Sequence, residues 1–249
     1  MTQVGLQLYT LRRECARDPQ ETLRAVAGMG YDGVELFDLM GVDAQRLRGW
    51  LDDTGLAVAG RHVGLDSVET QLDQLAPEAG VLGMSRLVVS WIEPPATIDD
   101  ARVTTRRITD AARGVVEHGF QLGFHNHAGE LEPLDGGGSF LDELREAPSE
   151  LIFLELDLGW IWDAGADPVD QLERTSGRCP LVHVKDFRTR GSRAFCPVGE
   201  GAVGYGRVIP AAVDAGAEWL LVEQDEIEGS PLEAVERSLR VVRRMLEPS

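Results

Sequence analysis

Eight short apolar segments alternate with longer amphipathic segments from one end of this sequence to the other. The apolar segments read as strands at 4–9, 33–37, 57–62, 86–91, 121–126, 152–157, 181–186 and 219–224. The segments between them, such as 103–119 and 231–246, repeat their apolar residues with helical spacing. Strands that alternate with helices favour a parallel sheet. Because eight such units in 249 residues suit a closed barrel with its helices outside, we predict a single-domain (β/α)8 TIM barrel over residues 1–249.

Local signals mark where the helices begin and end. A capping Asp or Ser followed by proline predicts helix starts at Asp18, Asp167 and Ser230. The "DSVE" stretch at Asp66 reads as a capping box without the proline. A doubly wound open sheet is the main rival fold, but it usually carries a glycine fingerprint after its first strand, and this chain has none there. The glycine-rich loop 198–206 comes after the seventh strand instead, where we expect a mobile loop over a site or an anion-binding loop.

Charge and composition narrow the class of partner. The chain holds 24 basic and 42 acidic residues, a net charge of −18, which disfavours nucleic acid and anionic membranes as partners. No apolar run approaches the roughly 18 residues of a membrane span, and the N-terminus shows no signal-peptide pattern. Cys15, Cys179 and Cys196 are odd in number and widely spaced, which disfavours disulfides and a zinc knuckle. We expect a cytoplasmic protein that acts on a small molecule.

Polar side chains gather at the carboxyl ends of the predicted strands, where a barrel of this kind carries its chemistry. Four of the five histidines lie at or near these ends, and the fifth, His118, lies at a helix end. The polar residues at the strand ends are Glu35, His62, His125, Asn126, His127, Glu130, Asp157, His183, Lys185, Asp186, Glu223 and Asp225. A lone histidine on a strand is more often a hydrogen-bonded core residue than a ligand. Because all these polar side chains lie at the same end of the predicted barrel, we expect them to form a functional site there.

Four of these residues form a candidate metal set. Glu130, Asp157, His183 and Glu223 each follow a different consecutive strand, the fifth to the eighth. Three carboxylates without a cation would repel one another and resist ionising. Because carboxylate oxygens dominate the set, it suits Mn²⁺, Mg²⁺ or Co²⁺, with Zn²⁺ as a further option. Glu155 lies two residues deeper than Asp157 on the same face of its strand, and we expect it to support the site rather than ligate.

At these residues the sequence resembles the xylose isomerase-like TIM-barrel family of sugar isomerases and epimerases, whose members include D-tagatose 3-epimerase, hydroxypyruvate isomerase and inosose dehydratase. The resemblance covers nearly the whole chain through "LQLYTLR", "GYDGVEL", "FHNHAGE", "LELDLGW", "LVHVKD", "VGEGAVGYG" and "WLLVEQD". It implies that Glu130, Asp157, His183 and Glu223 hold one divalent metal. It also implies that Glu130 and Glu223 act as acid and base on the substrate. Many relatives are dimers or tetramers, so a homo-oligomer is expected.

One position departs from the pattern of the ketose epimerases, which have a histidine three residues after the metal-binding Asp. Here that residue is Trp160. A bulkier and less polar wall suggests a ring-shaped substrate, such as an inosose or a keto-glycoside, although a free ketose stays open. Glu132 competes with Glu130 for the role of ligand. We expect His62, His127, Trp160, Lys185 and Glu35 to contact the substrate, while a simple ion pair with Asp186 is an equal alternative for Lys185.

The expected chemistry is proton abstraction next to a carbonyl, through a metal-bound enediolate. Reprotonation at the other carbon or the other face gives isomerisation or epimerisation, and loss of a β-hydroxyl gives dehydration. The sequence favours a sugar isomerase or epimerase, with an inosose-type dehydratase as the alternative. A metal-dependent phosphodiesterase or endonuclease would call for more histidines and a basic face. A sugar-binding barrel without catalysis would not need to keep all four ligands.

Overall fold

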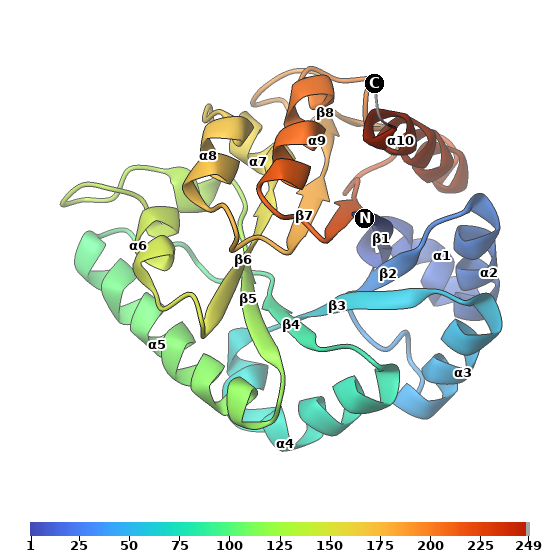
Figure 1. The fold of residues 1–249 in the computed structure, drawn as a ribbon, viewed down its shortest axis with the longest axis horizontal. Helices are drawn as coiled ribbons and strands as arrows, with labels where there is room; N and C mark the ends of the chain where they lie inside the picture. The colour runs from blue at the N-terminus through green and yellow to red at the C-terminus, as the bar shows by residue number, and fades with distance from the viewer. Residues whose placement is uncertain (248–249) are drawn as a thin grey trace.

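Eight parallel strands close into a barrel in the computed structural model, which describes residues 1–247. Going around the barrel, the strands follow the order β1-β10-β7-β6-β5-β4-β3-β2, and the helices surround them (Figure 1). The strands are β1 (Gln3–Gln7), β2 (Gly33–Leu36), β3 (Ala57–Val63), β4 (Arg86–Val89), β5 (Gln121–His125), β6 (Ile152–Asp157), β7 (Leu181–Val184) and β10 (Trp219–Val222). The predicted TIM barrel is confirmed.

The helices fill the intervals between the strands. They are α1 (Arg12–Arg17), α2 (Pro19–Met29), α3 (Ala44–Thr54), α4 (Leu65–Leu82), α5 (Ile98–Glu117), α6 (Phe140–Glu146), α7 (Leu158–Asp163), α8 (Pro168–Arg174), α9 (Tyr205–Asp214) and α10 (Pro231–Leu246), with the 3-10 turns η1 (Leu8–Leu11) and η2 (Gly129–Leu131). A short antiparallel hairpin, β8 (Asp186–Phe187) with β9 (Phe195–Cys196), follows β7. β7 and β10 end two residues before their predicted ends, and the residues that follow them, Lys185 and Glu223, contact each other at the site. β1 and β4 also end two residues early, before Leu8 and Ser90.

Most of the capping signals act as predicted. The carboxylate of Asp18 accepts the Glu21 N–H at the start of α2, and Ser230 caps α10. The capping box predicted at Asp66 was wrong: α4 begins at Leu65, and its N-cap is Gly64, two residues before Asp66. Arg107 of α5 pairs with both Asp66 and Glu69, at 2.5 and 2.6 Å. The two acids therefore join neighbouring helices instead of capping one.

The interior of the barrel is apolar at its amino-terminal end. A buried cluster of strand residues fills it: Ala59, Val88, Phe153, Leu181, Trp219 and Leu221. Gly123 makes room for this plug, since a Cβ there would lie 2.3 Å from the Phe153 ring. Polar residues therefore begin only above the plug.

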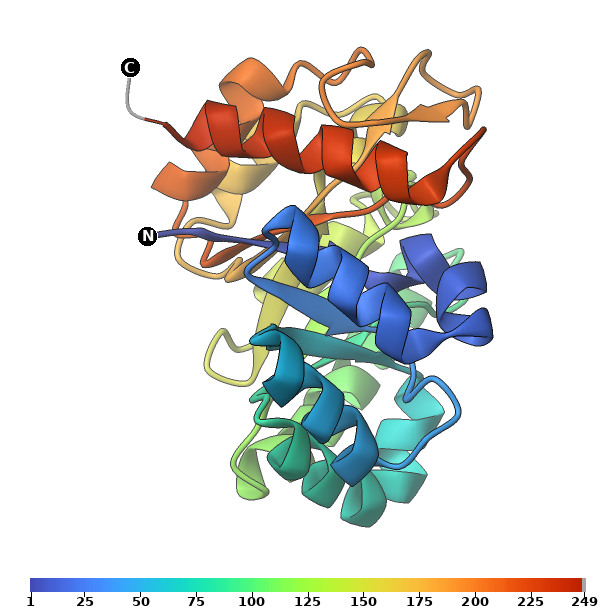
Figure 2. The same cartoon turned by 90° about the vertical axis from the view of Figure 1, so that its right-hand side faces the viewer.

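Strand alternation then stacks the interior side chains in layers. On β6, Phe153 lies in the plug, and Glu155 and Asp157 follow on the same face at successively higher levels. Figure 2 shows the barrel from the side, with both termini at one edge of the molecule. The N-terminus leads directly into β1, so the carboxyl ends of the strands point toward the opposite edge. Within residues 1–247, no helix combines the length and apolar composition of a membrane span.

Candidate metal centre and active site

A pocket of about 720 Å³ opens at the carboxyl ends of the strands. Five of the predicted site residues line it, namely His62, His127, Glu130, Trp160 and Glu223. Tyr9, Arg12, Trp91 and Arg193 also line it, and no sequence pattern marks them as site residues. The other predicted residues are buried, and each contacts a residue of the lining: Glu35, Asp157, His183 and Lys185.

Four side chains at the base of this pocket could hold a metal ion. His125, Asp157, His183 and Glu223 each offer a ligand atom within 4.8 Å of the other three. His183 Nδ1 lies 2.9 Å from Glu223 Oε2, and His125 Nε2 lies 4.0 Å from Asp157 Oδ2. Asp157 is partly committed, because its Oδ1 caps α7 by accepting the Trp160 N–H at 2.8 Å. Its Oδ2 is buried and accepts no hydrogen bond among the described residues, and it faces the Lys185 ammonium at 3.2 Å. A buried oxygen that has only an ion pair, beside two imidazoles and a second carboxylate, fits a divalent cation.

Glu130 stands apart from this set. It lies in η2, five residues beyond the end of β5, and its Oε2 accepts the His127 N–H at 2.8 Å. Its Oε1 is buried and has no hydrogen-bond partner among the described residues. The group of four contains His125, the last residue of β5, where the sequence predicts Glu130, and the assignment of Glu130 as a ligand stays a prediction. The place of His125 on the inward face of the strand, two residues after Gly123, was the signal that could have found it.

A deep layer of polar side chains lies between the metal set and the apolar plug; we define it as Gln7, Glu35, His62 and Glu155. Glu35 Oε2 accepts a hydrogen bond from Gln7 Nε2 at 2.7 Å and lies 3.1 Å from His62 Nε2. Glu155 Oε2 lies 2.8 Å from the same His62 nitrogen. Glu155 therefore has the supporting position expected of it.

His125 and His183 join the deep layer to the metal set. His125 Nδ1 lies 3.0 Å from Glu155 Oε2, and His183 Nε2 lies 2.8 Å from Glu35 Oε2. The opposite nitrogen of each ring points to the metal set. Imidazoles that bind metals usually donate their second N–H to a carboxylate, which fixes the tautomer and the ring orientation. A second group of side chains also has potential ligand atoms within 4.8 Å of one another, namely His62, His125, Glu155 and His183. Glu155 already bonds to the rings of His62 and His125. We therefore interpret this group as a support for the metal set.

Charge is balanced within the deep layer. Burial by itself would lower the pKa of His62, but Glu35 and Glu155 raise it to about 10. Burial would raise the pKa of Glu35, whereas His62 and His183 hold it well below its usual range. Burial and the Glu35 charge raise the pKa of Glu155. The deep layer thus contains close pairs of carboxylates and imidazoles that shift one another's pKa values.

The pocket carboxylates and His127 differ in protonation. Burial would raise the pKa of Glu223, but Lys185 and His183 hold it well below its usual range. Burial raises the pKa of Glu130. Burial and the charge of Lys185 lower the pKa of His127 to about 4, which leaves its ring neutral. The pocket therefore holds an ionised glutamate, a glutamate with a raised pKa and a neutral imidazole.

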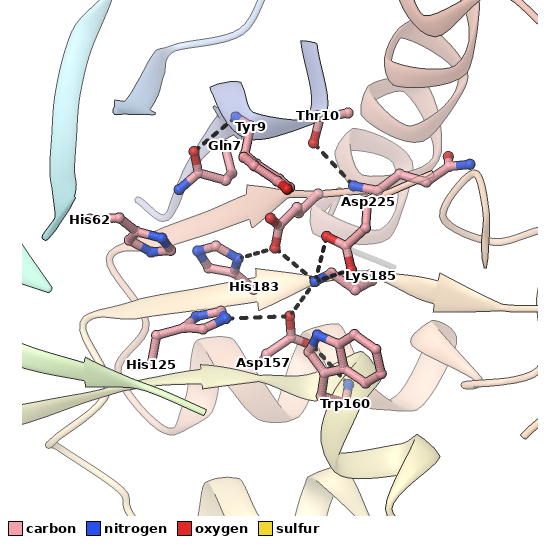
Figure 3. A network of polar contacts seen from close by, with 12 residues as sticks. Gln7, Tyr9, Thr10, His62, His125, Asp157, Trp160, His183, Lys185 and Asp225 are labelled. Atoms are coloured by element: carbon pink, nitrogen blue, oxygen red, sulfur yellow. Dashed lines mark hydrogen bonds and ion pairs between the residues drawn. The ribbon is translucent and has the colours of Figure 1, made fainter. Parts of the chain in front are cut away.

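Lys185 lies at the centre of the carboxylates. Its Nζ is 2.9 Å from Glu223 Oε2, 3.2 Å from Asp157 Oδ2 and 3.1 Å from Asp225 Oδ1. Figure 3 shows the ammonium between Asp157 and Asp225, with His183 and His125 alongside. Lys185 thus pairs with carboxylates of the site, and not with Asp186 as the alternative interpretation held.

Asp186 instead organises the glycine-rich loop 198–206. Its two carboxylate oxygens accept the N–H groups of Gly199, Gly201 and Val203 at 2.9, 3.1 and 3.2 Å. Gly201 is needed for this approach, because a Cβ there would lie 2.2 Å from Asp186 Oδ1. A carboxylate of the protein itself therefore occupies these amides, which could otherwise have bound an external anion.

Comparison with known proteins shows which family has this fold. The family model described as xylose isomerase-like TIM barrel matches residues 23–245. The chain belongs to this family. Solved structures share the fold: a sugar phosphate isomerase/epimerase from Parabacteroides distasonis superposes with a TM-score of 0.86 at 20% identity over 99% of this chain and 96% of that one. The IOLI protein, solved with a bound zinc atom, gives a TM-score of 0.76 at 13% identity over 98% of both chains.

Two curated relatives are similar in sequence. The rhizopine catabolism protein MocC of Rhizobium meliloti is 30% identical over 146 residues, which is 51% of this chain and 44% of that protein. The match therefore spans less than half of MocC. Inosose dehydratase of Geobacillus kaustophilus is 25% identical over 248 residues, covering 83% of this chain and 80% of that protein. The curated relative that matches over most of both chains is thus named for a dehydration, and the solved structure with the TM-score of 0.86 is named for sugar phosphate isomerisation or epimerisation.

Proposed function

We propose that the protein is a divalent-metal-dependent isomerase or epimerase that removes a proton next to the carbonyl of a ketose, an inosose or a keto-glycoside. The observation that carries this proposal is the set of His125, Asp157, His183 and Glu223, with both imidazoles held from behind by Glu155 and Glu35. Such support from behind is what a metal site requires.

The two pocket glutamates suit the two halves of a proton transfer. A bound divalent cation would act as a Lewis acid that makes the C–H beside a carbonyl more acidic. Glu223 is ionised and lines the pocket, so it can accept that proton. Glu130 also lines the pocket, and its raised pKa and unpaired Oε1 suit it to donate a proton from another direction. Carboxyl groups whose environments push their pKa values apart are suited to opposite acid–base roles.

The substrate would lie between aromatic and imidazole groups. His127 is neutral, and its buried Nδ1 has no hydrogen-bond partner among the described residues, so a substrate hydroxyl can bond to it. Trp160 lines the pocket beside it, with ring centroids 5.8 Å apart. This wall favours a ring-shaped substrate. His62 also lines the pocket, while Glu35 lies beneath it and positions His62.

Dehydration by the same site is the second candidate. The match to inosose dehydratase over most of both chains favours it. Removal of the first proton would be common to both reactions, and the alternative differs in the later loss of a β-hydroxyl.

Proton exchange in D₂O tests the proposal. Free ketoses, inososes and keto-glycosides would each be incubated with the protein and Mg²⁺, with and without a chelator, and followed by NMR. We expect chelator-sensitive deuterium incorporation beside the carbonyl of at least one compound, and its product would separate epimerase, isomerase and dehydratase. Exchange that the chelator leaves unchanged would refute the metal role.

Three further expectations stay predictions. Mn²⁺, Mg²⁺ and Co²⁺ remain the proposed metals, and the zinc in the IOLI protein keeps Zn²⁺ among them. A cytoplasmic location and a homo-oligomeric state, dimer or tetramer, are also proposed. Light scattering on the purified protein would test the oligomeric state.

A further inference from the structure

Lys185 is the only lysine in the 249-residue sequence; all other basic side chains that carry a permanent charge are arginines. Its side chain is only 1% exposed. A chain that uses arginine everywhere else has placed its one flexible, compact ammonium among the candidate metal ligands. An arginine would present a rigid planar fork there, whereas a lysine presents a point charge on a stem that can change rotamer.

The ammonium contacts the oxygens that a metal would need. Lys185 Nζ lies 2.9 Å from Glu223 Oε2 and 3.2 Å from Asp157 Oδ2. Apart from this ion pair, Asp157 Oδ2 has no hydrogen-bond donor among the described residues, and the other carboxylate oxygen of Asp157 is committed to the cap of α7. A metal binds such oxygens at about 2.0–2.2 Å. A divalent cation and the ammonium would then be close neighbours, and like charges at that distance repel strongly in a buried site.

The Lys185 ammonium has another carboxylate partner on the pocket side of the site. Lys185 Nζ is 3.1 Å from Asp225 Oδ1, and Asp225 lines the pocket with its side chain 22% exposed. The backbone of Lys185 is fixed, because Tyr205 Oη accepts its N–H and donates to its C=O, each at 2.8 Å. Only the side chain needs to move for the ammonium to leave Asp157 and Glu223 while it keeps Asp225.

We propose that Lys185 is a built-in competitor for the metal site. In the metal-free protein its ammonium neutralises Asp157 and Glu223. Metal binding displaces it toward Asp225, where it faces the pocket. This inference rests on the proposed metal site and adds a consequence: the protein holds its metal less tightly than its ligands alone would allow.

Calorimetric titration with Mn²⁺ tests the inference on wild type, Lys185→Met and Arg12→Met. Arg12 is a suitable control because it also lies at the pocket, where it pairs with Glu226 and does not contact the candidate ligands. We expect Lys185→Met to bind Mn²⁺ at least about tenfold more tightly than wild type, because a competing charge is gone, and Arg12→Met to change affinity by less than about threefold.

A second measurement needs no variant. With ¹⁵N-lysine labelling, the single lysine gives a single side-chain signal, and we expect Zn²⁺ to shift it as the ammonium leaves its two partners. If wild type binds Mn²⁺, equal or weaker binding by Lys185→Met together with an unmoved lysine signal would overturn the inference alone. If neither protein binds Mn²⁺ or Zn²⁺, the metal site itself is refuted, and the inference with it.

Discussion

The deep layer and the metal set are neighbours inside the barrel, yet they satisfy their polar groups in different ways. In the deep layer, Glu35 and Glu155 bond to imidazoles whose pKa values they raise. In the layer above, the three carboxylates of Asp157, Glu223 and Asp225 share the one ammonium of Lys185. The deep layer pairs one oxygen of each carboxylate with an imidazole, while Glu35 Oε1 and Glu155 Oε1 have no hydrogen-bond partner among the described residues. The upper layer has three carboxylates around one ammonium, and this difference separates the supporting residues from the reacting ones.

Replacing Glu223 with Gln should remove the proposed proton acceptor from the upper layer and leave the fold intact. We expect solvent-proton exchange to fall by at least about 10³-fold, or roughly 4 kcal/mol of barrier, because the proton acceptor is lost. Glu218→Gln is the matched control, since Glu218 lies at the other end of β10 and pairs with Arg86 on the surface. A Glu223→Gln protein with near-normal exchange would contradict the assigned role.

Replacing Glu35 with Gln should instead remove a charged partner from the deep layer and lower the stability of the protein. This change leaves His62 and His183 short of a buried counter-charge, so we expect a loss of about 3–5 kcal/mol in the free energy of unfolding, measured by urea titration in chelator. Glu78→Gln removes a peripheral partner of Arg61 and should cost much less. Similar costs for the two variants would show that the deep layer is no more than an ordinary set of polar contacts.

The deep layer should also make the metal-free protein sensitive to alkali. The pKa of His62 is raised from 6.5 to about 10, so its contribution to stability is fully present below pH 6.5 and is lost as the pH rises through 10. For one proton the slope is at most about 1.4 kcal/mol per pH unit. We expect the urea-unfolding free energy in chelator to fall over this window for wild type and His118→Asn, and to fall less steeply for His62→Asn. Equal slopes in all three would refute a charged His62.

Sequence patterns predicted the architecture well because burial and helix caps leave local signals. The run Phe153 to Asp157 shows its inward face by alternation alone. Alternation also places His125 on the inward face of β5, but the position of the Glu130 side chain depends on where the chain turns after that strand. The contact of Lys185 with three carboxylates depends on side chains from three strand ends, and the filling of the 198–206 amides by Asp186 depends on a loop closing back on itself.

Cobalt-substituted protein with ¹⁵N-labelled histidine gives the most direct test of the division between the layers. In this account the metal binds His125 through Nε2 and His183 through Nδ1, and the opposite N–H of each ring is held by a deep-layer carboxylate. Proton NMR should therefore show two strongly shifted, slowly exchanging imidazole N–H signals, of which His125→Gln removes one and His183→Gln the other. A single signal that only His183→Gln removes would show that His125 is not a ligand, and would return that place to Glu130.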